Sequence, residues 1–457
     1  MTATSGTAPS AGGKRKSNQQ PETAAANSGR HSGPPRMAWF VLGVGLIAYI
    51  VTVMQRTTLG VVGLDAAERF QISPGALSMF VFIQVAVYVA VQIPAGLLVD
   101  RWGSRIMLVV SGIFLIAGQL LVAFTTSIPA AIPARILVGT GDAIVFVAVL
   151  ALIPRWFPAH RVPLLTQLTG IFGQLGQILS AIPFAALLHS AGWSVAFSTA
   201  ASGSALAVVL VLAVVRNAPG RTWTPASTMS PRAIGAELKA VWLRPGTRLG
   251  FFGHMGTQFS MMVFILLWGV PYLVSAQHLS PATAGALMTV FVVCTILIGP
   301  VVGYLTMRHP MRRSWLLLGI IAANVTVWTV VLSLSEPAPF WLLVVLVVVL
   351  AADGPGSVVG FDIARTSNPS TSLGVAQSMV NTAGFLATLA VLAAMGAILT
   401  ALGGFTAEAF RVAWLVQYPV WAFAVIAVLI TRRKARRLDA SRGVFPRPLR
   451  EVLRAGR

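Results

Sequence analysis

The sequence is divided into about twelve apolar runs, and each run is long enough to cross a lipid bilayer as a helix. A hydrocarbon core about 30 Å thick needs roughly 20 residues at about 1.5 Å of rise per residue. Charged residues make up only 10% of the chain, whereas soluble proteins need about a quarter of their residues charged to cover a surface. We therefore expect an all-α integral membrane protein with twelve transmembrane helices. The expected spans are residues 37–63, 76–99, 106–126, 132–153, 163–187, 192–215, 249–275, 281–304, 314–334, 338–361, 373–402 and 410–431.

The ionisable residues exclude several classes of protein. A net charge of +21 would suit a nucleic-acid partner, but the basic residues lie between apolar runs and are not interleaved with aromatic residues, so no nucleic acid is expected. The single cysteine, Cys294, allows no internal disulfide, and the six histidines show no ligand spacing, so no metal or other cofactor is expected. The sequence contains no phosphate-binding loop, no HExxH pair and no recognisable nucleophile and base, which argues against an enzyme and against ATP as an energy source.

The basic residues predict how the chain crosses the membrane, because Lys and Arg of short loops are held on the cytosolic side. Residues 1–36 form a basic arm that we expect to be disordered, and residues 432–457 form a basic tail. Every second loop between the spans is basic as well. We therefore expect a multi-pass protein of the cell membrane with both termini in the cytosol. The basic loops contain Arg101, Arg105, Arg155, Arg161, Arg308, Arg312 and Arg313, together with the basic residues of segment 216–248.

A polar linker at residues 216–248 divides the spans into two sets of six, which occupy residues 37–215 and 249–431. The two sets contain a short repeat. Segment 96–101 reads GLLVDR and segment 303–308 reads GYLTMR, so Met307 stands where the first copy has Asp100. Two repeated bundles with a site between them can expose that site to either side of a membrane by rocking on each other.

The first repeat segment resembles motif A of the major facilitator superfamily, Gly-x-Leu-x-Asp-Arg-x-Gly-Arg-(Lys/Arg), from which it departs at Ser104. The motif, the twelve spans and the repeat together imply the transporter fold of that superfamily, two pseudo-symmetric six-helix bundles. The resemblance implies that Asp100 contacts the start of the eleventh span, near residues 368–372, and latches the cytosolic side closed. The alternative is that these charges only mark topology. The residues assigned to this conformational gate are Gly96, Asp100, Arg101, Gly103 and Arg105.

The fourth span contains residues 135–143, which resemble motif B of the superfamily, although Val138 replaces its usual glutamine. The resemblance implies a role for Arg135 in proton coupling, and we assign the same role to Asp142. The two residues share a helix face but are separated by about 10 Å of rise, so each needs a partner on another helix. Arg56 of the first span can pair with Asp142, because the fold of the superfamily brings these two helices together. That pair is either structural or part of a substrate and proton pathway.

The spacing of Tyr49 and Arg56 resembles the organic-anion branch of the superfamily, which includes glycerol phosphate and hexose phosphate transporters. The resemblance implies that Arg56 binds the anion, and a guanidinium group suits oxyanions because its donors match their oxygens. Those transporters have a second arginine at a position that aligns with Met262. A single arginine favours a monoanion, such as a carboxylate, over a dianionic phosphate ester.

The tenth span is interrupted at residues 351–356, where Asp353 is followed by Gly-Pro-Gly. Asp353 is either a proton acceptor or a solvated residue at a hinge. We interpret Asp362 and Arg365 as an ordinary helix-surface pair with no part in transport. Neutral polar residues within the spans can complete a substrate site. We select Gln84, His254 and Gln258 for it, alongside Tyr49 and Arg56; most other such residues are expected to hold helices together.

The leading functional prediction is a secondary transporter that takes up a small organic anion or metabolite together with a proton. The fifth span lacks the Gly-Pro-rich antiporter motif of many drug exporters, which favours symport. The partners expected are a small-molecule substrate, protons and the lipid bilayer, with the protein acting as a monomer. The alternatives are an exporter of lipophilic cations, which would use Asp142 or Asp353 as the counter-ion, and a receptor or scaffold that transports nothing. The substrate itself is not specified by the sequence.

Overall fold

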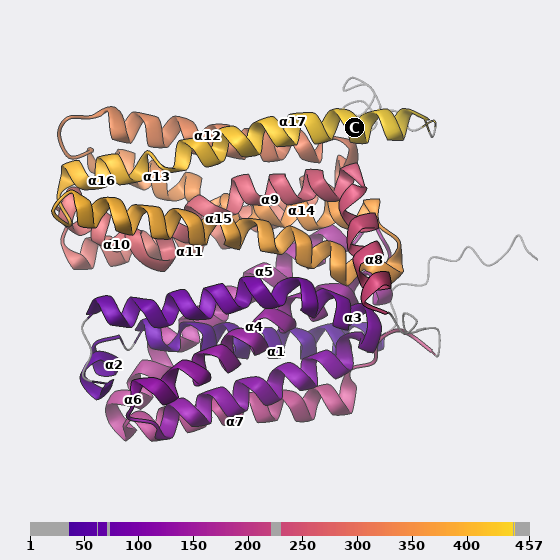
Figure 1. The fold of residues 1–457 in the computed structure, drawn as a ribbon, viewed down its shortest axis with the longest axis horizontal. Helices are drawn as coiled ribbons and strands as arrows, with labels where there is room; N and C mark the ends of the chain where they lie inside the picture. The colour runs from indigo at the N-terminus through magenta and orange to yellow at the C-terminus, as the bar shows by residue number, and fades with distance from the viewer. Residues whose placement is uncertain (1–35, 62, 71–73, 221–229, 442, 444–457) are drawn as a thin grey trace, which may run out of the picture.

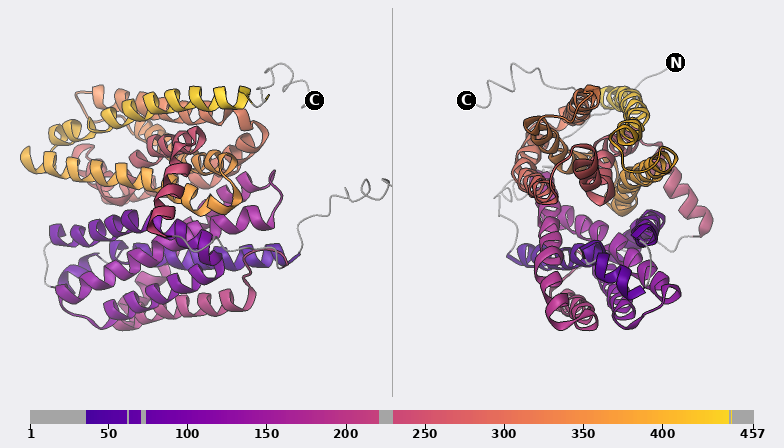
Figure 2. Two further views of the ribbon diagram at one scale, coloured as in Figure 1. Left: turned by 45° about the vertical axis from the view of Figure 1, so that its right-hand side comes forward. Right: turned by 90° about the vertical axis from the view of Figure 1, so that its left-hand side faces the viewer.

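The computed structural model describes residues 36–61, 63–70, 74–220, 230–441 and 443, and this part of the chain contains helices but no strand. The helices form two bundles that lie side by side, with a seam between them (Figure 1). Figure 2 shows the same division from two other directions. The first bundle contains α1 (Arg36–Val61), α2 (Gly63–Phe70), α3 (Pro74–Phe124), α4 (Ile128–Trp156), α5 (Val162–Leu179), α6 (Ala185–Ala191) and α7 (Trp193–Val214). The second contains α9 (Pro245–Val263), α10 (Gly269–Pro271), α11 (Pro281–Arg308), α12 (Arg313–Ser333), α13 (Phe340–Ala351), α14 (Asp353–Ser367), α15 (Leu373–Ala401), α16 (Ala407–Trp414) and α17 (Gln417–Ser441).

Eleven helical segments of the described chain are long and apolar enough to cross a membrane. One of them, Phe82–Phe124, has 43 residues, about twice the length that one span needs. Within it, Gly103 has non-helical dihedral angles (φ 81°, ψ 162°), which a residue without a Cβ adopts at little cost. Gly103 therefore ends one span and begins the next. The twelve spans predicted from the sequence are present, arranged as two six-helix bundles.

Several helix boundaries differ from the prediction by four residues or more, of which α9 and α17 are examples, and the linker contains a helix that was not predicted. α9 begins at Pro245 rather than at residue 249, because proline is well suited to the first position of a helix. α17 continues past residue 431 through ten residues of the predicted basic tail. In the linker, α8 (Pro231–Leu243) begins where the Ser230 hydroxyl accepts a hydrogen bond from the Ala233 amide. The predicted arm up to residue 35, residues 221–229 and the tail after residue 443 lie outside the described residues.

The loops that contain Arg101, Arg155, Arg308 and Arg313 all lie at one end of the bundles, which we call the basic end; the opposite end is the far end. The linker helix α8 lies at the basic end, on the right of Figure 1. This end of the seam is tightly packed. A Cβ atom placed on Gly96 of α3 or on Gly374 of α15 would collide with the backbone oxygen of the other glycine, so the two backbones are in contact. The hydrophobic core of the first bundle also includes Phe361, Val375 and Met379 of the second.

Candidate functional site

A central cavity of about 100 Å³ lies between the two bundles. Among the described residues the first bundle contributes Arg56 as the one charged lining residue, and the rest of the lining consists of aromatic, amide, hydroxyl and apolar residues. This composition is typical of a small-molecule site, where a few polar groups orient a ligand within apolar walls. The residues that line it include Tyr49, Arg56, Tyr88 and Gln174 from the first bundle and His254, Gln258, Met262, Asn381 and Phe385 from the second.

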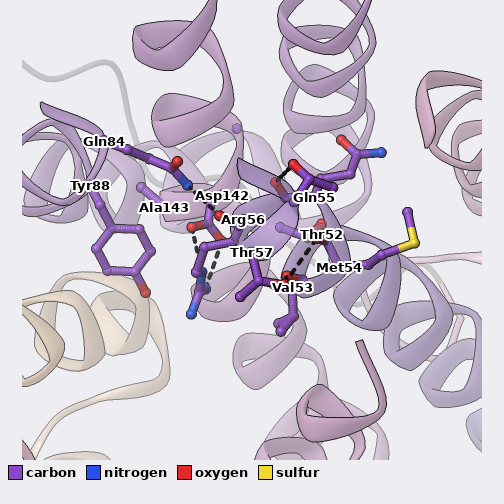
Figure 3. A network of polar contacts seen from close by, with 12 residues as sticks. Thr52, Val53, Met54, Gln55, Arg56, Thr57, Gln84, Tyr88, Asp142 and Ala143 are labelled. Atoms are coloured by element: carbon purple, nitrogen blue, oxygen red, sulfur yellow. Dashed lines mark hydrogen bonds and ion pairs between the residues drawn. The ribbon is translucent and has the colours of Figure 1, made fainter. Parts of the chain in front are cut away.

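Arg56 of α1 forms a bidentate ion pair with Asp142 of α4 (Figure 3). Its Nε atom lies 2.6 Å from Oδ2, and its Nη2 atom lies 2.6 Å from Oδ1. The Asp142 side chain is 2% exposed, whereas 21% of the Arg56 side chain is exposed, because the guanidinium group borders the cavity. The third nitrogen, Nη1, takes no part in this ion pair, and Tyr49 beside it in the cavity is a further side-chain hydrogen-bond partner of Arg56. A guanidinium group held along one edge in this way still presents donors to a second anion.

Tyr88 of α3 connects this cation to the second bundle. The guanidinium carbon of Arg56 lies 5.3 Å from the centroid of the Tyr88 ring, within the range of a cation–π interaction. The Tyr88 hydroxyl accepts a 2.9 Å hydrogen bond from Nδ2 of Asn381 on α15. Its ring also packs against Phe385, with ring centroids 4.5 Å apart. A ligand that displaced Arg56 would therefore disturb contacts across the seam.

Arg135 and Gln84 lie behind the ion pair and are not among the residues that line the cavity. Arg135 is 1% exposed, and its Nη1 atom donates a 3.0 Å hydrogen bond to Oε1 of Gln84. The Nε and Nη2 atoms of Arg135 are buried without a hydrogen-bond partner in the described part of the chain. The partners on other helices that Asp142 and Arg135 were expected to need are thus Arg56 and Gln84. The structure places Gln84, which we had selected for substrate contact, beside Arg135 instead.

Tyr49, His254 and Gln258 line the same cavity as Arg56, so four of the five residues selected for substrate contact lie together. The Nδ1 atom of His254 donates a 2.9 Å hydrogen bond to the carbonyl oxygen of Ser357, which sets the orientation of the ring. The ring packs edge-on against Phe361, 4.9 Å between centroids. The phenylalanines of the lining, Phe146, Phe361 and Phe385, were not singled out from the sequence, because phenylalanine in an apolar run carries no signal that separates a cavity wall from a core.

The interruption predicted in the tenth span lies between α13 and α14, at Ala352. Pro355 has no backbone N–H and so leaves the carbonyl of Ala351 without its helical partner; the Thr295 hydroxyl donates to that carbonyl at 3.2 Å. The carbonyl of Pro355 itself accepts a 2.6 Å hydrogen bond from Nε2 of Gln167, which belongs to the first bundle. The interrupted segment therefore contacts the first bundle through the carbonyl of Pro355, while the carbonyl that the proline frees is bonded within the second bundle.

Asp353 does not line the cavity. It is 1% exposed, and its Oδ1 atom accepts a 2.6 Å hydrogen bond from Nδ2 of Asn324 on α12. Asn324 was missed in the sequence, although an asparagine in the middle of the apolar run 314–334 could have indicated it. The other carboxylate oxygen, Oδ2, is buried without a hydrogen-bond partner in the part of the chain described. Asp353 is thus buried within the second bundle, not solvated.

At the basic end, Asp100 accepts hydrogen bonds from two backbone amides of α15. Oδ1 lies 2.8 Å from the Gly374 nitrogen, and Oδ2 lies 3.0 Å from the Val375 nitrogen. The contact expected between Asp100 and the eleventh span is present, but the donors belong to the first turn of α15 and not to residues 368–372. Because the first amides of a helix lack partners within it, a carboxylate is well placed there. Nη2 of Arg155 lies 3.8 Å from Oδ1.

The remaining motif A residues shape the turn next to Asp100. Beyond the turn at Gly103, the Arg105 amide donates a 2.9 Å hydrogen bond to Oδ1 of Asn217. The Arg105 side chain donates to the carbonyl of Leu212 at 2.6 Å, which holds the turn to the end of α7. Arg101 is half-buried. These contacts lie within the first bundle, so only Asp100 and Gly96 of the motif reach the second.

The interpretation of Asp362 and Arg365 as a helix-surface pair is wrong. Asp362 is only 4% exposed, because α12 covers it. Its carboxylate binds Arg313 of α12 as well as Arg365, whose Nε atom lies 2.9 Å from Oδ1. A sequence shows the neighbour three residues away, but it does not show the partner on another helix.

These features define a multi-pass membrane protein whose two helical bundles enclose a small polar cavity at their seam. The family model described as Major Facilitator Superfamily matches residues 45–270 and, a second time, residues 250–457. The chain belongs to the major facilitator superfamily and is therefore a member of a family of membrane transporters, not of enzymes.

Three comparisons describe its relatives. A protein of Bacillus subtilis (strain 168) named "Probable galactarate/D-glucarate transporter GudP" is 22% identical over 400 residues, covering 80% of this chain and 87% of the relative. The "Oxalate:formate antiporter" of Oxalobacter formigenes is 27% identical over 195 residues, 41% of this chain and 45% of the relative. A solved structure of the proton:xylose symporter XylE matches with a TM-score of 0.61 and 15% sequence identity. The match covers 87% of this chain and 96% of the XylE chain. The structural likeness shows a shared fold.

Proposed function

We propose that this chain takes up a small organic anion together with a proton by alternating access, with Arg56 as the anion-binding group. The observation that carries the proposal is the position of Arg56, the charged residue of the central cavity, whose Nε and Nη2 edge is held by Asp142 while Nη1 remains outside that pair. Two relatives are named for carboxylate substrates, galactarate or D-glucarate in one case and oxalate and formate in the other. Both names agree with an anion site.

Charge balance connects the anion to the proton. The Arg56–Asp142 pair is neutral when the cavity is empty, and charge is costly in a low-dielectric site. A monoanion bound at Arg56 would leave the site with one net negative charge. A proton on Asp142 restores neutrality and frees the Nε and Nη2 edge of Arg56 for the substrate. The site therefore favours binding one monoanion and one proton together.

The latch formed by Asp100 and α15 closes the basic end in this conformation, so the cavity would receive substrate from the far end. We place the basic end and both termini in the cytosol of the cell, because Lys and Arg are held on that side. The two bundles of one chain form the whole cavity, so a monomer suffices. An exporter of lipophilic cations is less favoured, because a cation would have to displace Arg56 from Asp142.

The test measures proton entry and substrate uptake in proteoliposomes that contain the purified protein and an internal pH dye. Small monocarboxylates, dicarboxylates, phosphate esters and lipophilic cations are added in turn to wild type, Arg56→Gln and Asp142→Asn. We expect a carboxylate to drive internal acidification in wild type and Arg56→Gln to lower its uptake at least a hundredfold. Asp142→Asn imitates the protonated carboxyl group, so it should still exchange labelled substrate across the membrane but no longer acidify the interior.

The control is Arg433→Gln, which removes an exposed arginine far from the cavity and should leave uptake unchanged. A response to lipophilic cations alone, with proton movement in the opposite direction and no effect of Arg56→Gln, would replace this proposal with cation export.

A further inference from the structure

A second and larger cavity, of about 460 Å³, lies at the basic end within the second bundle. It is bordered by α9, α12, α14 and α17, and it is separate from the central cavity, with which it shares no lining residue. Among the residues that the structure describes, four arginines line it, and Asp439 is the one acidic lining residue. A concave surface with this charge attracts anions. The four arginines are Arg244, Arg313, Arg432 and Arg436.

The contacts of these arginines leave positive charge uncompensated. Asp362 is shared between Arg313 and Arg365. The Nη1 atom of Arg436 lies 3.9 Å from Oδ2 of Asp439, at the edge of ion-pair distance. Arg244 and Arg432 have no carboxylate within ion-pair distance in the described part of the chain. They are held by neutral groups instead: Nη1 of Arg244 donates to the Ser367 carbonyl at 3.2 Å, and Nε of Arg432 donates to the Ser314 hydroxyl at 3.1 Å. Both guanidinium groups thus keep donors for a ligand.

The cavity lies where the protein passes from lipid to water. α17 is apolar up to residue 431 and becomes basic from Arg432 onward, so this arginine stands at the level of the lipid headgroups. The guanidinium group of Arg432 also lies 4.5 Å from the ring centroid of Trp315, whose side chain is 55% exposed on the outer surface of α12. Tryptophan is typical of the membrane interface. Leu438, which lines the cavity, is exposed as well. An apolar surface therefore adjoins the positive one.

We propose that this cavity binds the phosphate group of an anionic ligand, through Arg432 and Arg436 on adjacent turns of α17. Guanidinium groups match phosphate oxygens with paired, charge-assisted hydrogen bonds, and basic pockets between transmembrane helices bind lipid headgroups in this manner. Either an anionic phospholipid or a soluble phosphate presents this group. The exposed Trp315 and Leu438 beside the arginines favour the phospholipid, since its acyl chains would lie against them. The site does not depend on which solute the central cavity carries.

The test measures the thermal unfolding midpoint of the full chain in detergent while a lipid or an ion is titrated. One arm adds phosphatidylglycerol, with phosphatidylcholine as the neutral lipid, and a second arm adds inorganic phosphate against chloride at equal ionic strength. The main variant is Arg432→Gln/Arg436→Gln. Its matched control is Arg433→Gln/Arg437→Gln, which removes the same charge from exposed positions of the same two turns.

We expect phosphatidylglycerol to raise the midpoint of wild type and of the control, and the apparent Kd to rise at least tenfold in Arg432→Gln/Arg436→Gln. Ala435→Leu narrows the cavity without changing its charge and should weaken the lipid effect in the same way, which separates loss of the site from loss of charge. Stabilisation by inorganic phosphate that phosphatidylglycerol does not increase assigns the site to a soluble phosphate. Equal weakening in both double variants, or no effect of either ligand on wild type, overturns the proposal.

Discussion

The two bundles repeat one plan, but they place charge differently at their basic ends. In the first bundle the loop carboxylate of Asp100 crosses the seam to α15 and lies near Arg155, at the end of α4. In the second bundle the polarity is reversed, since Arg313 after the loop pairs with Asp362 near the end of α14. That pair stays inside its own bundle. Met307 stands at the repeat position of Asp100, so this position of the second copy offers no carboxylate to α5.

The same difference recurs at the middle of the bundles. The fourth span of each bundle has a buried aspartate, Asp142 on α4 and Asp353 on α14. Asp142 is paired with a cation that borders the cavity, whereas Asp353 is bonded to the neutral amide of Asn324. The repeat thus supplies the scaffold twice, but the ion pair that borders the central cavity and the carboxylate of the latch each occur once, in the first bundle. This difference between the bundles can be tested by removing the ion pair or the latch from the first bundle and comparing the result with a matched substitution in the second.

The largest effect is expected from Arg56→Gln. It leaves the carboxylate of Asp142 buried without a counter-ion, and removing one partner of a buried pair costs about 3–5 kcal/mol of stability. The matched change in the second bundle, Asp353→Asn, keeps an acceptor for Asn324 and should cost less than about 1 kcal/mol. Thermal and denaturant unfolding in one detergent would measure both.

The control for Arg56→Gln is Arg56→Gln/Asp142→Asn, in which both charges are gone. It should recover most of the lost stability but no transport. An Arg56→Gln protein as stable as wild type would show that Asp142 does not depend on Arg56.

An intermediate effect is expected from Asp100→Asn, which weakens the charge-assisted bonds to the α15 amides. Bonds of this kind contribute about 1.5–3 kcal/mol, so the basic end should open roughly ten to a hundred times more often. Ser378→Cys, buried in the seam beside Gly96, reports that opening through its rate of maleimide labelling in a Cys294→Ser chain. Arg313→Gln, which removes a charge that does not cross the seam, should leave the rate unchanged. Equal acceleration by both changes would contradict a latch specific to the first bundle.

The smallest effect is expected from adding one methyl group to each copy of the repeat. Gly96→Ala meets the backbone oxygen of Gly374 and should lower stability by about 1–3 kcal/mol, as overpacking does. Gly303→Ala meets only side-chain atoms, 3.2 Å away in Gln167 and 3.3 Å in Leu164, which can move aside, so its cost should be below about 1 kcal/mol. Thermal unfolding midpoints of the two variants measure this difference. Similar losses of stability in both variants would mean that the seam is equally tight at the two glycines.

Much of the fold could be predicted because the bilayer limits the choices. A span must be a helix of roughly 20 apolar residues, so length and hydropathy locate it. The helix ends were predicted less well, because helices extend beyond the apolar runs: α9 begins at a proline, and α17 continues into the basic residues that follow its apolar part. The position of α8 was missed, since a polar amphipathic helix outside the membrane lacks the apolar signal.

Part of the site could be predicted as well. Ionisable residues within the spans are few, so Arg56, Asp142, Arg135 and Asp353 stood out. The pairing of Arg56 with Asp142 was predicted from the family resemblance, but the partners of Arg135 and Asp353 were not. The interpretation of Asp362 failed for the same reason that Asn324 was missed: each contact joins two helices, and helical spacing describes neighbours on one helix only.

The sequence by itself determined that the chain spans a membrane twelve times in two repeats, that it belongs with transporters, and which few charges lie in lipid. The resemblance to the family also predicted two contacts that the structure contains, Arg56 with Asp142 and Asp100 with the start of α15. The tertiary structure decided the rest: it brought Arg313 to Asp362 and Asn324 to Asp353, and it left Arg432 beside an open cavity. The physical reason is that hydropathy and charge are properties of single residues along the chain. An ion pair, a latch or a cavity depends on the distance between helices, which packing alone sets.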